Sequence, residues 1–484
     1  MSNKVLKAGL GYTIGNYLLK GLAFFTIPIF ARLLNPSDYG QYNTFVAYES
    51  ILFVIIGFAI HSSYKNARYK YGIVHEGAVK GQDYCNYVST TLAMIAVSLG
   101  IWLSLVNIFG KYLVKLLSLD LFSLYLLLLF AFGSAVVCCF NVDVGLQYKF
   151  KSFLTVAAIN AIGSIGLSIL LICTVCNEQR YLGRVIGTVL PLLILAIYII
   201  CHYFKRAKPC NYHSFLSWGL RYSLPIVPHG ISQVILSQFD RIMINSMIGS
   251  FQAGVYSFAY NIFTIVAVTS TSIDNAWGPW FYEKMHEKNY EEIKQKSKFY
   301  MLFLFCFTAG IILVSPELIG FLGTREYEEA VYSAIPIIAG GFFAFMYNIP
   351  ASVEYYYEKT RFIALGTVMA AVINIILNYI FINKYGYIAA AYTTLMTYFL
   401  YFYFHYFLAW KIHKSSLFNN RIVCLTSAGI ILISFATMML LDTAVCRWLL
   451  MLCLIGCGLI YEEKKLGLGY SVKKRFIRKG HTNG

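Results

Sequence analysis

Charged residues are scarce in this sequence, and their scarcity excludes a water-soluble globular protein. Of the 484 residues, only 13% are charged and 58% are hydrophobic, so too little polar surface exists to cover a globule of this size. Backbone N–H and C=O groups in lipid must be hydrogen-bonded within the protein, which leaves helices or a closed barrel. The apolar runs at 121–137 and 422–441 are unbroken rather than alternating, which excludes the barrel.

Motifs of catalysis and of nucleotide hydrolysis are also missing from the sequence. It has no P-loop, no HExxH, no Gly-x-Ser-x-Gly and no loop much longer than about 25 residues. Without a P-loop, the chain cannot drive transport by its own ATP hydrolysis. We therefore expect a transporter rather than an enzyme. A membrane glycosyl polymerase or ligase is the enzymatic alternative, although such enzymes typically present long outer loops.

The 12 cysteines lack the spacing of a zinc or haem site, and most lie in apolar segments as small core hydrophobes. Cys173 and Cys176 form a CxxC motif, which we interpret as chance spacing at a helix end. No metal and no organic cofactor is therefore expected.

Apolar segments of transmembrane length recur along the whole chain and predict an all-α, polytopic membrane protein with about fourteen spans. The predicted spans are 9–31, 42–62, 86–106, 120–141, 152–174, 183–204, 219–245, 253–276, 299–316, 331–351, 362–382, 386–410, 421–441 and 444–461.

Lysine and arginine are concentrated in alternate loops, which sets the orientation. The loops assigned to the cytoplasm include Lys65, Arg68, Lys70, Lys149, Lys151, Lys205, Arg206, Lys284, Lys288 and Lys411, together with the basic tail. The outer loops carry far fewer cations and hold an acidic cluster at Glu326, Glu328 and Glu329. We predict a multi-pass protein of the bacterial cytoplasmic membrane with both termini inside. The net charge of +17 follows from this topology and indicates no nucleic-acid binding.

A weak internal repeat connects the two halves of the sequence. Asp38-Tyr39-Gly40-Gln41-Tyr42 opens the second span, and Gln252-Ala253-Gly254-Val255-Tyr256 opens the eighth. A second pair of matching motifs, at 181–187 and 385–390, opens the sixth and twelfth spans at a similar offset of a little over 200 residues. The pattern predicts two six-helix lobes with pseudo-two-fold symmetry and a two-helix appendix. Glycines that only allow close helix packing are the simpler alternative.

The sequence resembles the oligosaccharide flippases of polysaccharide biosynthesis. The resemblance rests on the plan of six, six and two spans, the 32–40 loop (Arg-Leu-Leu-Asn-Pro-Ser-Asp-Tyr-Gly), the 222–228 segment (Tyr-Ser-Leu-Pro-Ile-Val-Pro) and the pair Asp240 and Arg241. These belong to the multidrug, oligosaccharidyl-lipid and polysaccharide exporter superfamily. The resemblance implies an N-lobe at 1–204, a C-lobe at 205–416, two further spans at 417–461 and a cytoplasmic tail at 462–484. It also implies alternation between inward-open and outward-open states.

The resemblance further implies a substrate and partners. The substrate would be an undecaprenyl-diphosphate-linked oligosaccharide repeat unit, carried across the membrane for cell-surface polysaccharide such as O-antigen or capsule. We expect a monomer that contacts membrane lipids and works with a polysaccharide polymerase and a chain-length regulator. A cation-coupled multidrug exporter and a flippase for the peptidoglycan precursor remain alternatives within the same superfamily.

Cations inside or near the spans are the candidates for binding an anionic diphosphate, because a charge at the bilayer centre is retained only when it is paired or faces water. Lys20 lies near the middle of the first span, with Asn16 one turn earlier on the same face. A structural pair between Lys20 and Glu49 is the alternative reading. Arg32, Arg221 and Arg241 complete the proposed positive lining.

Polar residues form one stripe along the seventh span. His229, Gln233, Ser237 and Asp240 are spaced by four, four and three residues, and Pro225 and Pro228 should break the helix before them. The stripe is expected to face a cavity or the partner lobe, and His229 and Gln233 are candidate substrate-binding residues. Asp240 and Arg241 could instead form a local structural pair.

Three acids within the spans are candidates for binding a coupling cation, H+ or Na+. They are Asp240, Glu49 and Asp274.

The first testable prediction concerns the charge of Lys20. Lys20→Ala should abolish export of the surface glycan while the protein remains inserted, because a lone midplane cation is tolerated only where it binds something negative. Surface glycan and membrane protein level are measured in the same cells. Normal glycan with Lys20→Ala would show that Lys20 does not bind substrate.

Overall fold

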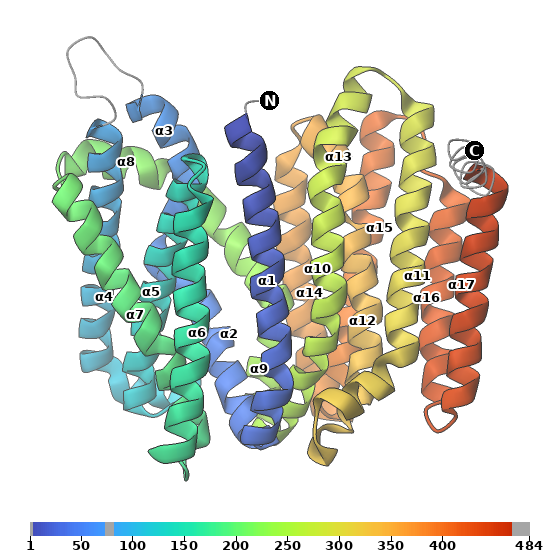
Figure 1. Cartoon of the computed structure of the whole chain (residues 1–484), viewed down its shortest axis with the longest axis horizontal. Coiled ribbons are helices and arrows are strands. Elements are labelled where there is room, and N and C mark those ends of the chain that lie inside the picture. Colours follow the sequence, from blue (N-terminus) through green and yellow to red (C-terminus); the bar gives the residue numbers. More distant parts are fainter. Residues whose placement is uncertain (1–2, 73–81, 467–484) are drawn as a thin grey trace, which may run out of the picture. The chain divides into compact units, whose positions relative to one another are not determined.

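In the computed structural model, residues 3–72 and 82–466 are described, and every regular element within these ranges is a helix (Figure 1). The helices are α1 (Asn3–Leu33), α2 (Pro36–Gly57), α3 (Tyr64–Gly72), α4 (Gln82–Leu117), α5 (Leu121–Leu146), α6 (Phe150–Thr174), α7 (Arg180–Arg206), α8 (Tyr212–Ser223), α9 (Val227–Met247), α10 (Ser250–His286), α11 (Tyr290–Leu322), α12 (Ala330–Met346), α13 (Asn348–Tyr356), α14 (Thr360–Tyr385), α15 (Ala389–His413), α16 (Asn420–Met439) and α17 (Ala444–Leu466). Three single 3₁₀ turns, η1 (Ile60–Ser63), η2 (Leu224–Ile226) and η3 (Arg325–Tyr327), connect some of them.

The prediction of an all-α, polytopic membrane protein is confirmed. Each predicted span coincides with one long helix or with consecutive helices. Within the described residues, nine helices are long and apolar enough to cross a membrane, or ten if a bent pair counts as one span. The exact number of fourteen spans stays a prediction.

The chain divides into two compact units. Unit 1 comprises residues 1–258, 322–327 and 364–393, and unit 2 comprises residues 259–321, 328–363 and 394–484. The predicted lobe boundaries at residues 204 and 416 remain predictions. The last part of the predicted basic tail, residues 467–484, lies outside the described residues.

Unit 1 contains two interruptions that shape its helices. After α2, Phe58 and Ala59 both adopt left-handed backbone conformations, and the chain bends by 53° before continuing through η1 into α3. Before α9, the predicted break at Pro225 and Pro228 is confirmed by the 3₁₀ turn η2. Proline lacks an N–H and cannot continue the helical hydrogen bonds, so the polar stripe lies on a separate helix, α9, that begins after this turn.

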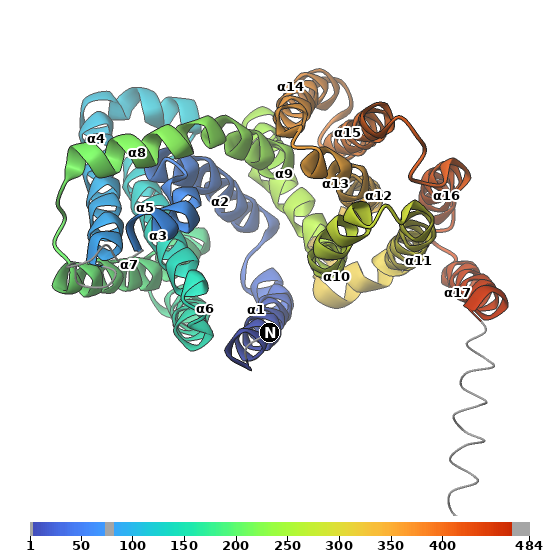
Figure 2. The same ribbon diagram turned by 90° about the horizontal axis from the view of Figure 1, so that it is seen from above.

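Helix α2 lies between α5 and α9, against which it packs (Figure 2). Its first turn meets the first turn of α10 at two glycines, Gly40 and Gly254. A Cβ atom at Gly40 would overlap the carbonyl of Ser250, and one at Gly254 would overlap the carbonyl of Pro36. The two helix backbones are therefore in direct contact. These glycines are the matching positions of the predicted Gly-x-Tyr repeat.

Aromatic side chains and hydrogen bonds reinforce this crossing. The rings of Tyr39 and Tyr327 are 5.8 Å apart, and those of Phe258 and Tyr327 are 4.6 Å apart. Burial raises the pKa of the Tyr327 hydroxyl, which stays protonated and donates a hydrogen bond to the Leu34 carbonyl at 3.1 Å. Ser37 and Ser250 add a hydroxyl-to-hydroxyl bond of 2.5 Å. The side chains around the crossing thus stabilise a contact between two helix backbones at which the glycines have no side chains.

The second prediction follows from the glycine contact. Gly40→Ala should lower the melting temperature of the purified protein, because overpacking at a backbone contact costs about 1–3 kcal/mol. Gly100→Ala in α4 is the matched control, since a Cβ there would meet no atom within 4 Å. Equal melting temperatures for the two variants would contradict the close crossing.

Candidate functional site

The buried carboxylate of Asp240 lies at the centre of a polar network in unit 1. Asp240 is on α9 and is only 1% exposed. The Tyr256 hydroxyl, on α10, donates to its Oδ2 at 2.7 Å, and the Asn378 amide, on α14, donates to its Oδ1 at 2.7 Å. A buried charge without such donors would be strongly destabilising, so these bonds hold Asp240 in place.

A second layer of polar groups holds Asn378. Its amide also donates to Asn374 Oδ1 at 3.2 Å, one turn earlier on α14, and Thr393, on α15, donates its hydroxyl to Asn378 Oδ1. Four helices therefore bring carboxylate, amide and hydroxyl oxygens together where the structure excludes solvent. Oxygen ligands of this type suit hard cations.

Sequence reasoning identified Asp240 but missed its partners. Asn374 and Asn378 are four residues apart on a largely apolar segment, which is the same signal that exposed the stripe on α9. Tyr256 was part of the Gly-x-Tyr motif, where it was considered only as a repeat marker. That these groups converge on Asp240 depends on tertiary packing, which spacing along one helix does not reveal.

The remaining stripe residues lie on α9 as predicted, within a single helix. His229, Gln233 and Ser237 are half-buried, and the Ser237 hydroxyl donates to the Gln233 carbonyl at 3.0 Å. Arg241 is buried and donates to the Ser237 carbonyl at 3.1 Å and to the Gln238 side chain. Arg241 is therefore engaged by its own helix, whereas Asp240 is engaged by α10 and α14.

The other two candidate acids have separate sets of partners. Glu49, buried on α2, lies near the hydroxyls of Ser134 and Ser50 in unit 1. Asp274, half-buried on α10 in unit 2, accepts bonds from Tyr300 and, at 2.6 Å, from the Asn348 amide. Each of the three acids therefore has different neighbours.

The candidate cations are also distributed over several elements. Arg32 is exposed at the end of α1 and donates to the Pro28 carbonyl at 2.8 Å, and Arg221 is exposed on α8. The side chains of Lys20 and Asn16 lie outside the described residues, so their roles stay predictions.

Two further groups were not expected from the sequence as candidates. In unit 1 the guanidinium of Arg184 lies 3.7 Å from the ring centre of Phe30 and 4.9 Å from that of Tyr42, and donates to Ser168 at 3.0 Å. In unit 2, Glu354 and His405 are fully buried and joined by a contact of 2.5 Å. Neither group carried a spacing pattern that distinguishes it from core residues.

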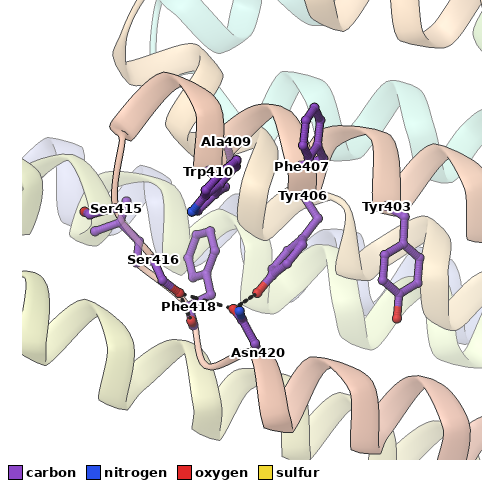
Figure 3. Close-up of a pocket in the computed structure, with 10 residues that line it drawn as sticks. Tyr403, Tyr406, Phe407, Ala409, Trp410, Ser415, Ser416, Phe418 and Asn420 are labelled. Atoms are coloured by element: carbon purple, nitrogen blue, oxygen red, sulfur yellow. Dashed lines mark hydrogen bonds between the residues drawn. The ribbon is translucent and has the colours of Figure 1, made fainter.

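An aromatic pocket of about 310 Å³ lies at the end of α15 and the start of α16 (Figure 3). Tyr406, Trp410 and Phe418 line it, and several of its polar groups are joined by hydrogen bonds. The Tyr406 hydroxyl donates to Asn420 at 2.6 Å, and Ser416 donates to the Phe418 carbonyl at 2.6 Å. These bonds close the loop that joins the two helices, and they give the pocket a structural explanation.

Comparison with known proteins identifies the family. A family model described as polysaccharide biosynthesis protein matches residues 5–285, more than half of the chain. The chain belongs to the polysaccharide biosynthesis protein family. The predicted resemblance is thus confirmed, and a second model, MatE, matches residues 225–380.

Relatives of this family member come from distant organisms. "Lsg locus putative protein 1" of Haemophilus influenzae is 21% identical over 76% of this chain and 89% of its own length. "Probable low-salt glycan biosynthesis flippase Agl15" of Haloferax volcanii is 21% identical over 80% of this chain and 79% of its own.

Solved structures show the same fold. An inward closed conformation of the lipid II flippase MurJ has a TM-score of 0.72 at 15% identity and covers 93% of this chain and 99% of its own. An inward-facing multidrug resistance MATE transporter has a TM-score of 0.57 at 14% identity and covers 82% of this chain and 96% of its own. The polysaccharide biosynthesis family member therefore has the fold of this transporter superfamily.

The third prediction concerns Asp240. Asp240→Asn should abolish transport at normal protein level, because it removes the negative charge while it keeps the size of the side chain. Tyr256→Phe is the matched control, since it removes one donor and leaves the carboxylate. Surface glycan is scored for both variants. If both variants lost surface glycan to the same extent, transport would depend on the hydrogen bond between Tyr256 and Asp240 rather than on the charge of Asp240.

Proposed function

We propose that the protein is a flippase that moves undecaprenyl-diphosphate-linked oligosaccharide repeat units from the cytoplasmic to the outer leaflet of the cytoplasmic membrane. The observation that carries the proposal is the match of the polysaccharide biosynthesis model to residues 5–285. The flippase named among the relatives, which acts in glycan biosynthesis by its description, supports it. The chain acts as a transporter and not as an enzyme in this proposal.

The chemistry of the substrate agrees with the candidate residues. A diphosphate cannot cross hydrocarbon without a polar path, whereas its polyprenyl tail can remain in lipid. In the proposal, Lys20, Arg32, Arg221 and Arg241 supply positive charge to that path, with Asn16, His229 and Gln233 as polar neighbours. The protein alternates between inward-open and outward-open states. Both termini of the chain, including its basic C-terminal tail, are cytoplasmic.

A coupling cation fits the Asp240 network best. Asp240, Asn374, Asn378 and Thr393 offer buried oxygens from three helices, and they would hold Na+ or share a proton. The bound ion would supply positive charge to the buried carboxylate. Glu49 and Asp274 are secondary candidates. A polysaccharide polymerase and a chain-length regulator remain the proposed partners of a monomeric flippase.

Two other functions have support from particular observations. The MatE match at residues 225–380 favours a cation-coupled multidrug exporter, and the likeness to the lipid II flippase favours transport of the peptidoglycan precursor. An organic cation would require an acidic path, whereas the peptidoglycan precursor has the same anionic headgroup chemistry as the proposed substrate.

The fourth prediction distinguishes these functions. A strain that lacks the gene should lose surface glycan while it keeps its tolerance to cationic dyes and grows with normal peptidoglycan. Complementation with Lys20→Arg should restore glycan and Lys20→Glu should not, because the sign of the charge selects an anionic substrate.

The alternatives give different phenotypes in the same strain. Intact glycan with increased dye sensitivity would identify a multidrug exporter. Cell lysis with accumulated peptidoglycan precursor would identify the precursor flippase.

A further inference from the structure

A groove of about 610 Å³ runs along α5, α6 and α7 in unit 1. Helices α6 and α7 lie side by side (Figure 1), and they form most of its walls. The groove is at the end of these helices where the lysine and arginine pattern places the cytoplasm. It contains none of the residues considered so far for substrate or ion binding.

Three cations from two helices form the rim of the groove. Lys149 and Lys151 flank the start of α6, and Arg206 ends α7. All three side chains are exposed, and none of the ion pairs between described residues involves them. Arg206 and Lys149 are both close enough to act electrostatically on His202, so the charges of the two helices converge. Among the described residues, the rim is therefore positive and its three cations form no ion pair.

Asp143 is the one carboxylate among the described residues that line the groove, and hydrogen-bond donors cover it. Asp143 is 1% exposed and accepts hydrogen bonds from the hydroxyls of Tyr84, at 2.8 Å, and Tyr203, and from the Gln147 amide at 2.7 Å. These donors shield it from the groove, where three cations outnumber it. The Gln147 amide is engaged by the same carboxylate.

The wall below the rim is apolar and open. Ile159 on α6 and Ile194 and Tyr198 on α7 are each more than half exposed although they line the groove. Val144 and Leu195 form its floor. An apolar trough beneath a positive rim matches a molecule with one hydrocarbon end and one anionic end.

We propose that this groove binds an anionic phospholipid of the adjacent leaflet. The phosphate lies among Lys149, Lys151 and Arg206, and an acyl chain follows Ile159, Ile194 and Tyr198. Basic pockets between transmembrane helices on the cytoplasmic side are suited to such headgroups. None of the residues proposed for the substrate path lines this groove, and the proposal holds whether the substrate is a glycan lipid or a drug.

The test uses the full-length protein in nanodiscs that contain phosphatidylglycerol with a photoreactive group in its acyl chain. After illumination, mass spectrometry should find label on peptides that contain Ile159 and Ile194. Unlabelled phosphatidylglycerol should compete for labelling, and phosphatidylcholine should not. The double variant Lys149→Gln, Arg206→Gln should reduce labelling about 25-fold, since each of the two cations contributes about fivefold to the binding of anionic lipid.

The matched control is the double variant Lys205→Gln, Lys208→Gln. It removes the same charge from exposed neighbours that do not line the groove, and it should label like the wild type. Equal competition by the two lipids, or equal loss of labelling in the control variant, would overturn the proposal. Competition by undecaprenyl phosphate at lower concentration than phosphatidylglycerol would also overturn it, because the groove would then be a substrate site. Size-exclusion profiles check that both variants are folded.

Discussion

Hydrocarbon provides no hydrogen bonds, and this constraint governs both the backbone and the buried charges of the protein. It explains why every regular element in the described residues is a helix. It also explains why buried ions have several partners each. Arg447, 3% exposed in unit 2, bonds to Glu317 and to the Leu440 carbonyl at 2.7 Å, and Asp240 and Asp143 are likewise held by donors from other helices. Asp240, Asp143 and Arg447 are therefore positioned largely by groups outside their own helices. Arg241, in contrast, bonds within its own helix.

Features that depend on one helix could be predicted from the sequence. The apolar segments, the break at Pro225 and Pro228, and the polar stripe that ends at Asp240 each follow from local spacing or from the chemistry of proline. The family could also be predicted, because its motifs extend over much of the chain.

Features that depend on several helices could not be predicted in the same way. Tyr256 and Asn378 meet Asp240 only after α9, α10 and α14 pack, and Asp143 meets Tyr84 and Tyr203 from two other helices. The spacing of residues along single helices also did not distinguish Asp240, Glu49 and Asp274 as candidates for cation binding, although the three acids have different neighbours in the structure. The chemistry of each acid is decided by which helices surround it, and that information is spread over the whole sequence.

The contact between Gly40 and Gly254 has a consequence for how the two halves of the gene can change. These positions match each other in the repeat, and each one occupies the space that a side chain on the other helix would need. A larger residue at either glycine would therefore clash with the backbone of the other helix. No change of rotamer can relieve this clash, because the clashing atoms belong to the backbone. One shared steric limit therefore applies to both helix openings, however far the rest of the two predicted repeat halves diverge.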